Sequence, residues 1–505
     1  MPNKLSTIAA IIAFASAGFY TNSPAQTAFS ADRLLYDIGL MVEAQNTFGS
    51  EHSPLWLNAN KQGLSSVKAG NGYLRLQAVK PAAADSTHRW RMGFGADVAA
   101  TYNHTAPLLV RQLYAEVEYR ALRLTVGSRD NRLNLKNDLL SSGGQTYGIN
   151  ALPLPGITLE LPEYLRLDRG GFIGIRGHVG FSRFTDGAWQ QNYVDEGRAY
   201  AKGVNLHTKS GFLRIGNEAR FPLVFEAGLE TATQFGGTAY NLLDTPGETL
   251  ALGSSFTDIM HAITMTGSDA TDSEYANATG NTLGSWLFSL SYTFPTWKVR
   301  AYYDHFFEDH SMLFFQYGWK DGMIGLEVTL PRNRFVDNVV CEYINTEYQS
   351  GPVYHDHTPQ IPDQISGIDN YYNHALYGGW QHRGQAIGNP LTRSFLYAGA
   401  PHRIYFTGNR FKAHHIGISG RPTPTIAYRL LYTHTRGLGT YALPYAEALR
   451  QHSILAEINF APHTLCGIDT RGWSGTAAIG IDSGKLTGNN SGLQITLRRH
   501  FTIAK

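Results

Sequence analysis

The 505-residue sequence has few cysteines, little net charge and no long apolar run in its main part. Its two cysteines, Cys341 and Cys466, exclude a disulfide framework and a cysteine metal site. They could pair in an oxidising compartment, or stand apart as two apolar strand residues. A net charge of +2 with 16% charged residues gives no polyelectrolyte signal, which argues against nucleic acid as a partner.

The N-terminal stretch has the composition of a secretory signal peptide. Lys4 precedes an apolar run over residues 8–19, and small residues lead up to Gln26. The run is too short and wrongly flanked for an anchor helix, and no cysteine marks a lipoprotein. We expect residues 1–25 to be removed on export and residues 26–505 to form a single domain. Because nothing later approaches the roughly 18 apolar residues of a membrane helix, that domain is either soluble in the envelope or a β-barrel.

Strict alternation of apolar and polar residues is abundant. In residues 285–294, Trp286, Phe288 and Leu290 share one face while serines occupy the other, and residues 92–102 show the same pattern. Period two is typical of half-buried strands. A soluble β-sandwich alternates as well, so the connection lengths carry more information.

Short and long connections alternate along the chain. The sequence predicts strands near 35–49, 72–81, 89–103, 111–119, 122–129, 156–166, 172–184, 206–216, 223–232, 285–294, 298–307, 322–330, 336–346, 411–419, 425–434, 452–460, 474–485 and 491–501. These are eighteen strands, and every long loop between them falls on one side. This pattern predicts an all-β fold, an antiparallel transmembrane β-barrel with short periplasmic turns and long extracellular loops. A soluble all-β protein is the alternative.

Charges of both signs lie on the predicted inward faces. They are Glu116, Glu118, Arg123, Arg129, Arg176, His178, Glu226, Glu230, Arg300, Asp304, Glu327 and Arg429. Such a mixture favours a salt-bridged, partly closed interior over an ion-selective channel. The segment LSSGGQTYGINALPLPG, residues 140–156, is the candidate to fold inward and plug the bore.

The stretch DNYYNHALYGGWQHRGQAIGNP, residues 369–390, has neither strand nor helix periodicity and is typical of a long loop. Sugar rings stack on aromatic faces, and their hydroxyls need amides, carboxylates or guanidinium groups. The candidate glycan-binding residues are therefore Asp369, Asn370, Tyr371, Tyr372, Asn373, Tyr377, Trp380 and Arg383, with Glu308 and Asp309 from the same rim. An interfacial aromatic belt with loop-to-loop hydrogen bonds is the alternative.

Signals for catalysis and metal binding are weak. Glu308 and Asp309 are adjacent strand residues that point to opposite faces, which suits a glycosidase pair poorly. The histidines at 355–357 and 414–415 lack a third ligand at defined spacing, and Ser65-Ser66-Val67-Lys68 is not followed by the rest of a serine-enzyme signature. We expect no enzyme, no cofactor and no metal.

An ordered series of motifs over most of the chain resembles the Wzi-type capsule assembly proteins. These are outer-membrane barrels that hold capsular polysaccharide at the cell surface. The matching stretches are residues 53–64, 140–164, 206–216, 228–237, 302–327, 342–352, 367–391 and 409–420. Phe235 and His310 depart from the family pattern. The resemblance implies an eighteen-stranded barrel, carbohydrate binding at the outer face without an enzymatic step, and work alongside the capsule export machinery.

Two functions follow as hypotheses. The first is a non-enzymatic, lectin-like outer-membrane protein that anchors capsular or another surface polysaccharide, with its loops facing the cell exterior. The second is an outer-membrane porin or transporter for sugars or oligosaccharides. A continuous wet bore favours the channel, and a plug at 130–155 favours the lectin. The expected partners are polysaccharide and outer-membrane lipid, and the expected oligomeric state is a monomer.

Overall fold

The computed structural model describes residues 38–82, 89–265, 280–308, 313, 320–331, 333, 335–355 and 364–503. The expected signal peptide, residues 1–25, lies outside this part of the chain. Within it, no helix combines the length and the apolar character that are needed to cross a membrane.

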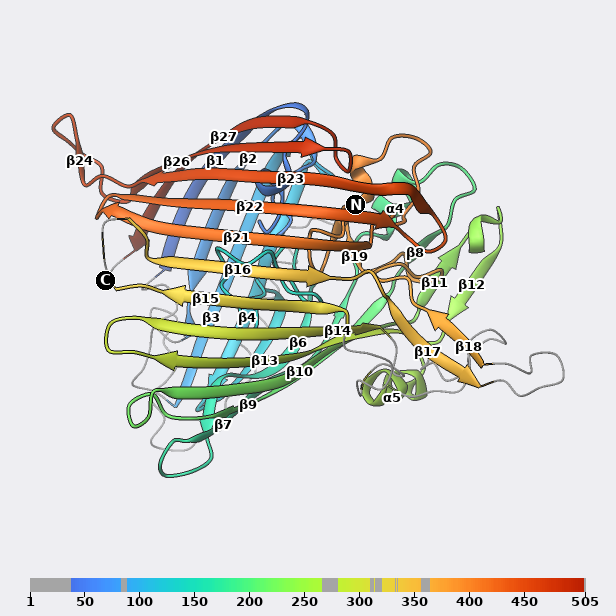
Figure 1. Cartoon of the computed structure of the whole chain (residues 1–505), viewed down its shortest axis with the longest axis horizontal. Coiled ribbons are helices and arrows are strands. Elements are labelled where there is room, and N and C mark those ends of the chain that lie inside the picture. The colour runs from blue at the N-terminus through green and yellow to red at the C-terminus, as the bar shows by residue number, and fades with distance from the viewer. Residues whose placement is uncertain are drawn as a thin grey trace, which may run out of the picture.

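Eighteen antiparallel strands form one closed sheet, in which successive strands pair along the chain and β1 pairs with β27 (Figure 1). The barrel strands are β1 (Ile38–His52), β2 (Lys68–Lys80), β3 (Trp90–Tyr102), β4 (Leu108–Tyr119), β5 (Leu122–Ser128), β6 (Gly156–Arg166), β7 (Ile173–Arg183), β9 (Asn205–Ile215), β10 (Leu223–Phe235), β13 (Asn281–Thr293), β14 (Lys298–Glu308), β15 (Gly322–Thr329), β16 (Asn338–Asn345), β21 (Arg410–Thr423), β22 (Ile426–Gly439), β23 (Pro444–Phe460), β26 (Trp473–Gly484) and β27 (Asn490–Ile503). The predicted barrel and its eighteen strands are confirmed. The closed sheet leaves no barrel strand with an unpaired edge.

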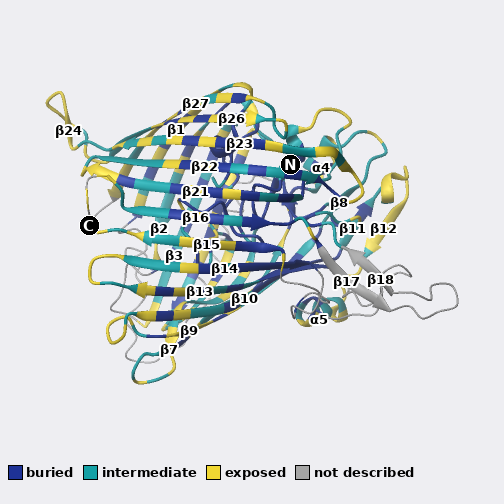
Figure 2. Ribbon diagram, in the orientation of Figure 1, coloured by how far each residue is buried: buried dark blue, intermediate teal, exposed yellow. Residues whose placement is uncertain are grey.

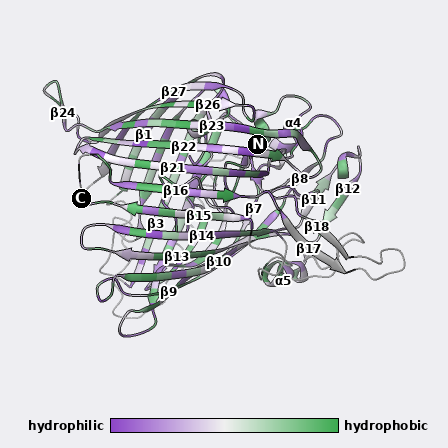
Figure 3. Ribbon diagram, in the orientation of Figure 1, coloured by the Kyte–Doolittle hydropathy of each residue, from purple (hydrophilic) through white to green (hydrophobic). Residues whose placement is uncertain are grey.

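Hydrophobic and hydrophilic residues alternate along the strands, as the colours of Figure 3 show. This alternation places apolar side chains on the outer face and polar side chains in the interior. On β2, the outward Leu74 and Leu76 are 52% and 51% exposed, whereas the inward Arg75 between them is 8% exposed. Outward Ile324 and Leu326 on β15 repeat the pattern at 58% and 45%. An even-stranded closed barrel with an apolar outer face is of the outer-membrane type.

The two ends of the barrel differ in their connections (Figure 1). One end has short turns, and its longest connection, residues 461–472, carries the hairpin β24 (Thr464–Leu465) and β25 (Ile468–Asp469). The other end has the long connections, which we call the loop end. These carry α3 (Leu55–Asn58), α4 (Gly187–Tyr193), β8 (Tyr200–Lys202), β11 (Gly237–Tyr240), η2 (Leu242–Asp244), β12 (Thr249–Leu252), α5 (Phe256–Thr264), β17 (Ser350–His355), β18 (Gln364–Ile368), β19 (Gln381–His382), β20 (Gln385–Ala386) and η4 (Phe395–Tyr397). The predicted gathering of the long loops at one end is confirmed.

The two cysteines are free and exposed. Cys341 lies on β16, and Cys466 lies in the turn between β24 and β25 with a positive φ of 50°. The alternative of a disulfide between them is therefore excluded, and only Cys341 is a strand residue.

Candidate functional site

Three connections of the loop end fold into the barrel. They are residues 53–67, 129–155 and 369–397, and together we call them the plug. Figure 2 shows their buried residues as dark blue chain between the strands of the loop end. Backbone hydrogen bonds join the segments: Gln62 N donates to Ile149 O at 2.6 Å, and Gly148 N donates to Ile387 O at 2.9 Å. The predicted inward folding of residues 140–156 is confirmed.

Two wall carboxylates hold the middle plug segment. Glu342 on β16 accepts hydrogen bonds from Ser141 Oγ at 2.5 Å and from Ser142 N at 2.8 Å. Asp304 on β14 pairs with Lys136 Nζ at 2.7 Å and accepts a hydrogen bond from Gln145 N at 3.2 Å. Since all these carboxylates and donors are buried, each contact satisfies a group that would otherwise be costly to remove from water.

The first plug segment contacts a different sector of the wall. Trp56 of α3 donates from Nε1 to Thr433 Oγ1 on β22 at 3.1 Å, and its ring lies 5.1 Å from that of His415 on β21. His415 in turn contacts the middle segment, with Nε2 2.8 Å from Leu140 O. Leu55 N donates to Asp482 Oδ2 on β26 at 2.9 Å. The plug thus spans the lumen from β14 to β26.

The aromatic residues of 369–390 form the core of the third plug segment. Phe306 on β14 meets Tyr371 and Tyr372 edge-on, with ring centroids 4.8 Å and 5.6 Å apart. Trp380 Nε1 donates to Thr146 O at 2.8 Å, and Tyr371 Oη donates to Asp321 Oδ2 at 3.0 Å. These rings bind the third segment to the wall and to the second segment.

These rings do not form an exposed surface in the folded protein. Tyr371 and Tyr372 are each 2% exposed, Tyr377 is 6% exposed and Trp380 is 0% exposed. The reason is that the loop turns inward, where the rings gain apolar contact that a loop over the barrel mouth would leave in water. Glycan binding by them stays a prediction that requires the plug to move.

The structure brings together only some of the polar residues that the sequence suggested for glycan binding. Asn370 Oδ1 accepts from Asn373 Nδ2 at 2.9 Å and from Asn409 Nδ2 at 2.7 Å, which orders the loop. Glu308 Oε1 accepts from Tyr372 N at 2.6 Å. Arg383 lies apart, with its backbone N 3.2 Å from Asp186 Oδ2. Half-buried Asp369 donates from its backbone N to Gln349 O at 3.1 Å, at the base of the hairpin formed by β17 and β18. Asp309 lies outside the described residues.

Burial sets the protonation of the plug. It raises the pKa of Tyr371 and Tyr372 well above the usual range, and nearby Asp321 acts in the same direction on Tyr371. Burial also lowers the pKa of His374 to about 4. These side chains are therefore neutral at neutral pH, and both phenols keep the proton that each donates.

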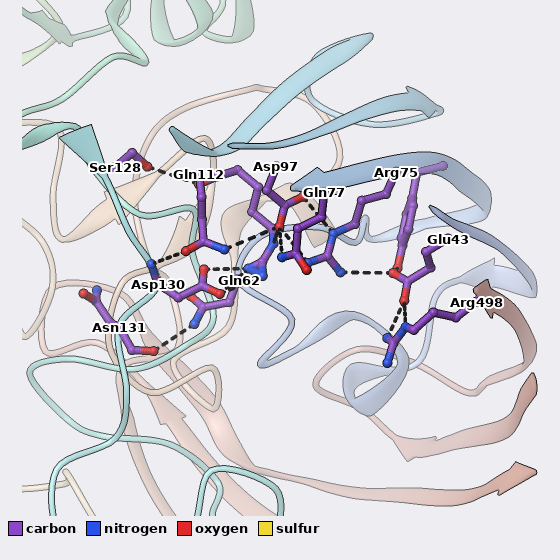
Figure 4. A network of polar contacts seen from close by, with 12 residues as sticks. Glu43, Gln62, Arg75, Gln77, Asp97, Gln112, Ser128, Asp130, Asn131 and Arg498 are labelled. Carbon is purple, nitrogen blue, oxygen red and sulfur yellow. Dashed lines mark hydrogen bonds and ion pairs between the residues drawn. The ribbon is translucent and has the colours of Figure 1, made fainter. Parts of the chain in front are cut away.

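A chain of charged contacts links the wall to the start of the middle plug segment (Figure 4). Arg75 on β2 pairs with Glu43 on β1 at 3.1 Å and with Asp97 on β3 at 2.7 Å. Arg111 on β4 then joins Asp97 at 3.0 Å to Asp130 at 2.5 Å. The predicted salt-bridged interior is thus confirmed, and Asp130 connects it to the plug.

In the inner half of the lumen, toward the short turns, solvent reaches some of the inward side chains, whereas others, such as Glu43 and Glu118, are buried. Inward-facing Arg498, Arg300 and Arg429 have side chains that are 39%, 22% and 20% exposed. Each is paired with a carboxylate, as Arg429 is with Glu457 at 2.9 Å. The bore is therefore polar and partly accessible to solvent near the short turns, and filled by the plug toward the loop end.

Sequence reasoning missed Glu342 and Asp130 as residues that hold the plug. Their signal was available: Glu342 lies between the outward Cys341 and Tyr343, so period two places it in the lumen. What the pattern could not show was that two serines about 200 positions earlier would meet it, since the pairing spans 201 residues. The paired histidines are also separated, with His415 inside and His414 exposed. Among the described residues, no group of three suitable side chains could hold a metal ion.

No family model matches this chain, and no curated protein matches it. Solved structures similar to it include OprD of Pseudomonas aeruginosa, at 9% identity and a TM-score of 0.46, covering 93% of this chain and 96% of that chain. OccK9 (OpdG) of Pseudomonas aeruginosa is 9% identical with a TM-score of 0.47, covering 92% of this chain and 98% of that one. A BenF-like porin from Pseudomonas fluorescens Pf-5 is 7% identical with a TM-score of 0.47, covering 93% of this chain and all 100% of its own.

These comparisons correct the resemblance to the Wzi-type capsule assembly proteins. No family model and no curated protein supports that resemblance. The similar solved structures are other outer-membrane barrels, and one of them is named as a BenF-like porin. The ordered motifs that suggested the family are short, glycine-rich and aromatic, a composition that alternating barrels share for physical reasons. The chain is an eighteen-stranded outer-membrane barrel whose lumen holds a plug.

Proposed function

We propose that this protein is an outer-membrane channel for polar solutes, sugars or oligosaccharides among them, with its loop end facing the cell exterior and its bore closed by the plug. The observation that carries the proposal is the polar, charge-paired inner half of the lumen, in which Arg498, Arg300 and Arg429 remain partly exposed. A barrel that served only as a surface anchor would have no need of a polar, partly solvated lumen behind its loops.

Displacement of the plug is the step that opens the channel. Besides the apolar packing of its aromatic residues, the plug is held to the wall by hydrogen bonds and ion pairs, such as those of Glu342 and Asp304. Water can replace such contacts at a small net cost, because an exchanged hydrogen bond is worth only about 0.5–1.5 kcal/mol. A solute with hydroxyl groups can replace them in the same way.

Solute flux tests the proposal. The purified protein is reconstituted into liposomes, and swelling is followed with neutral mono- and oligosaccharides. A variant in which residues 133–151 are replaced by a short glycine-serine linker serves as the open reference. We expect wild-type swelling above protein-free liposomes, and faster swelling with the variant. If the variant conducts while the wild type never exceeds protein-free liposomes, the plug is permanent and the channel proposal fails.

A surface carbohydrate-binding protein is the second candidate, and the filled loop end of the bore favours it. Asn370, Asn373 and Arg383 are half-buried at that end and offer amide and guanidinium groups to a polymer. The test is the ratio of cell-bound to shed surface polysaccharide with and without the gene. Release of polymer while its synthesis continues supports this role, and an unchanged ratio rejects it.

A further inference from the structure

The outer face of the barrel carries a row of bases close to the loop end. The strand register places Lys412 on β21 opposite Arg436 on β22, and Arg436 opposite Arg450 on β23. We call these three residues the basic row. Two positions nearer the short turns, the same register aligns His414, His434 and His452.

Both rows stand on the lipid-facing side. Ile416, Tyr432 and Ile454 follow on the same face of the same strands and are 40%, 38% and 41% exposed. Alternation with period two therefore points the basic row outward as well. Its exposure agrees, since the side chains of Lys412 and Arg436 are 35% and 40% exposed. From the loop end toward the short turns, this outer face therefore carries first the basic row, then the histidines and then apolar residues.

Positive charge exceeds negative charge in this sector. Lys412 and Arg436 share one carboxylate, Glu347, at 2.7 Å and 2.6 Å. A fourth base, Arg410, lies with its guanidinium 3.5 Å from the ring centre of Tyr441. Within the described residues, neither Arg410 nor Arg450 has a carboxylate partner. These four bases therefore outnumber Glu347, and the other acid at this end of β23, Glu447, is already paired with Lys485 at 2.6 Å.

The position of the basic row along the membrane normal matches the level of the lipid headgroups. Phe460 begins the exposed apolar face of β23 near the short turns, and Arg450 lies ten residues further along the strand. At about 3.3 Å per residue and a tilt of about 40°, this separation corresponds to about 25 Å across the membrane, which is the usual height of the apolar band. The basic row therefore lies where the acyl chains end and the headgroups begin.

We propose that this face binds the phosphate groups of an anionic lipid in the leaflet at the loop end. Arginine pairs with phosphate through two parallel N–H donors, and lysine adds a point charge. The acyl chains of the same lipid would lie on Ile416, Tyr432 and Ile454. In the orientation of the proposed function, this is the outer leaflet. A second copy of the chain suits the face poorly, because a two-fold contact there would bring bases against bases.

The test measures lipid binding to the purified protein in a neutral detergent by native mass spectrometry. The probe is lipid A with its phosphates, compared with the same lipid after dephosphorylation and with inorganic phosphate. The variant replaces Lys412, Arg436 and Arg450 by glutamine. Its matched control replaces Arg220, Arg421 and Arg471, three exposed arginines at the opposite end, by glutamine. Retention of the folded barrel is checked for both by heat-modified gel mobility.

We expect the wild type to prefer the phosphorylated lipid. Each base near a charged membrane surface contributes about fivefold in affinity, so loss of the three lowers binding by about a hundredfold. The control should keep wild-type binding. Equal binding of both lipids, an equal loss in the control, or full displacement by inorganic phosphate would each overturn the proposal. So would dimerisation of the wild type that the triple variant alone abolishes. None of these readouts requires the barrel to conduct, so the result stands apart from the channel proposal.

Discussion

Arg111 of the barrel wall holds Asp130 of the plug with both of its terminal nitrogens: Nη1 lies 2.5 Å and 2.6 Å from the two carboxylate oxygens, and Nη2 lies 2.7 Å from Oδ2. The same guanidinium donates from Nε to Asp97 at 3.0 Å. One arginine therefore joins the wall network to the first residues of the inward segment. The bidentate pair fixes both the distance and the orientation of Asp130 where the plug enters the lumen.

Replacing Arg111 by lysine should loosen this entry point. Lysine keeps the charge but loses the planar fork that bonds Asp97 and Asp130 at once. A hydrogen bond to a charged group is worth about 1.5–3 kcal/mol, so backbone amides of residues 130–140 should exchange with deuterium about thirtyfold faster. Arg421→Lys at the short turns is the control. Unchanged exchange in Arg111→Lys would show that the pair does not hold the plug.

Glu342→Ala should destabilise the plug more than Glu342→Gln. The carboxylate accepts from Ser141 and Ser142, and also from Tyr302 Oη at 2.5 Å. Alanine leaves three buried donors without an acceptor, at about 1–3 kcal/mol for each donor that water cannot reach. Glutamine retains one carbonyl acceptor. Limited proteolysis within residues 129–155 measures the difference, and Glu218→Ala, on the exposed surface, should cleave like the wild type. Equal cleavage of the alanine and glutamine variants would contradict the anchoring role.

Trp380→Phe and Trp380→Ala should separate packing from hydrogen bonding. Trp380 is fully buried, and its indole N–H donates to Thr146 O. Truncation to alanine should lower the free energy of unfolding by about 3–5 kcal/mol. Phenylalanine loses the hydrogen bond and leaves Thr146 O unsatisfied, which should cost about 1–3 kcal/mol. Denaturant unfolding in detergent gives both values. Effects below about 0.5 kcal/mol, as found for surface positions, would mean that Trp380 is exposed after all.

Stability should rise with pH above neutrality through Lys61 of the plug. Burial lowers the pKa of this amine from 10.5 to about 8 in the folded protein. Between about pH 8 and 10.5 the unfolded chain therefore holds more protons than the folded one, and unfolding becomes less favourable as pH increases. Below about pH 8 the amine is protonated in both states, and its contribution is constant. Thermal unfolding from pH 7 to 10.5 tests this, and Lys61→Met should flatten that part of the profile. A wild-type curve parallel to that of Lys61→Met would refute the assignment.

The barrel was predictable because its signal is local. Alternation over a few residues marks each strand, and turn length marks the end at which it reverses, so the eighteen strands and the side of the long loops follow from neighbouring residues. The plug at 140–156 was predictable for a related reason, since an apolar, glycine-rich connection of this length has to be buried somewhere.

The contacts of the aromatic residues in 369–390 were not predictable in the same way. Its composition suits an exposed stacking surface and a buried core equally, and only a partner distant in sequence distinguishes them. Trp380 meets Thr146 across 234 residues. Gly388 illustrates the same limit: it resembles a turn glycine, but a side chain there would lie 2.1 Å from the carbonyl oxygen of Gln145. Close approach of two remote segments leaves no local pattern.

The sequence separation of these contacts couples the folding of the plug to that of the barrel. The middle plug segment follows β5, yet the residues that hold it, Glu342 and His415, belong to β16 and β21, and the contacts span 201 and 275 residues. Thirteen of the eighteen barrel strands follow this segment in the chain, and its binding site is incomplete until β16 and β21 have joined the sheet. The final contacts of the plug and of the barrel wall therefore depend on each other, since the two sides of each contact lie far apart in the sequence.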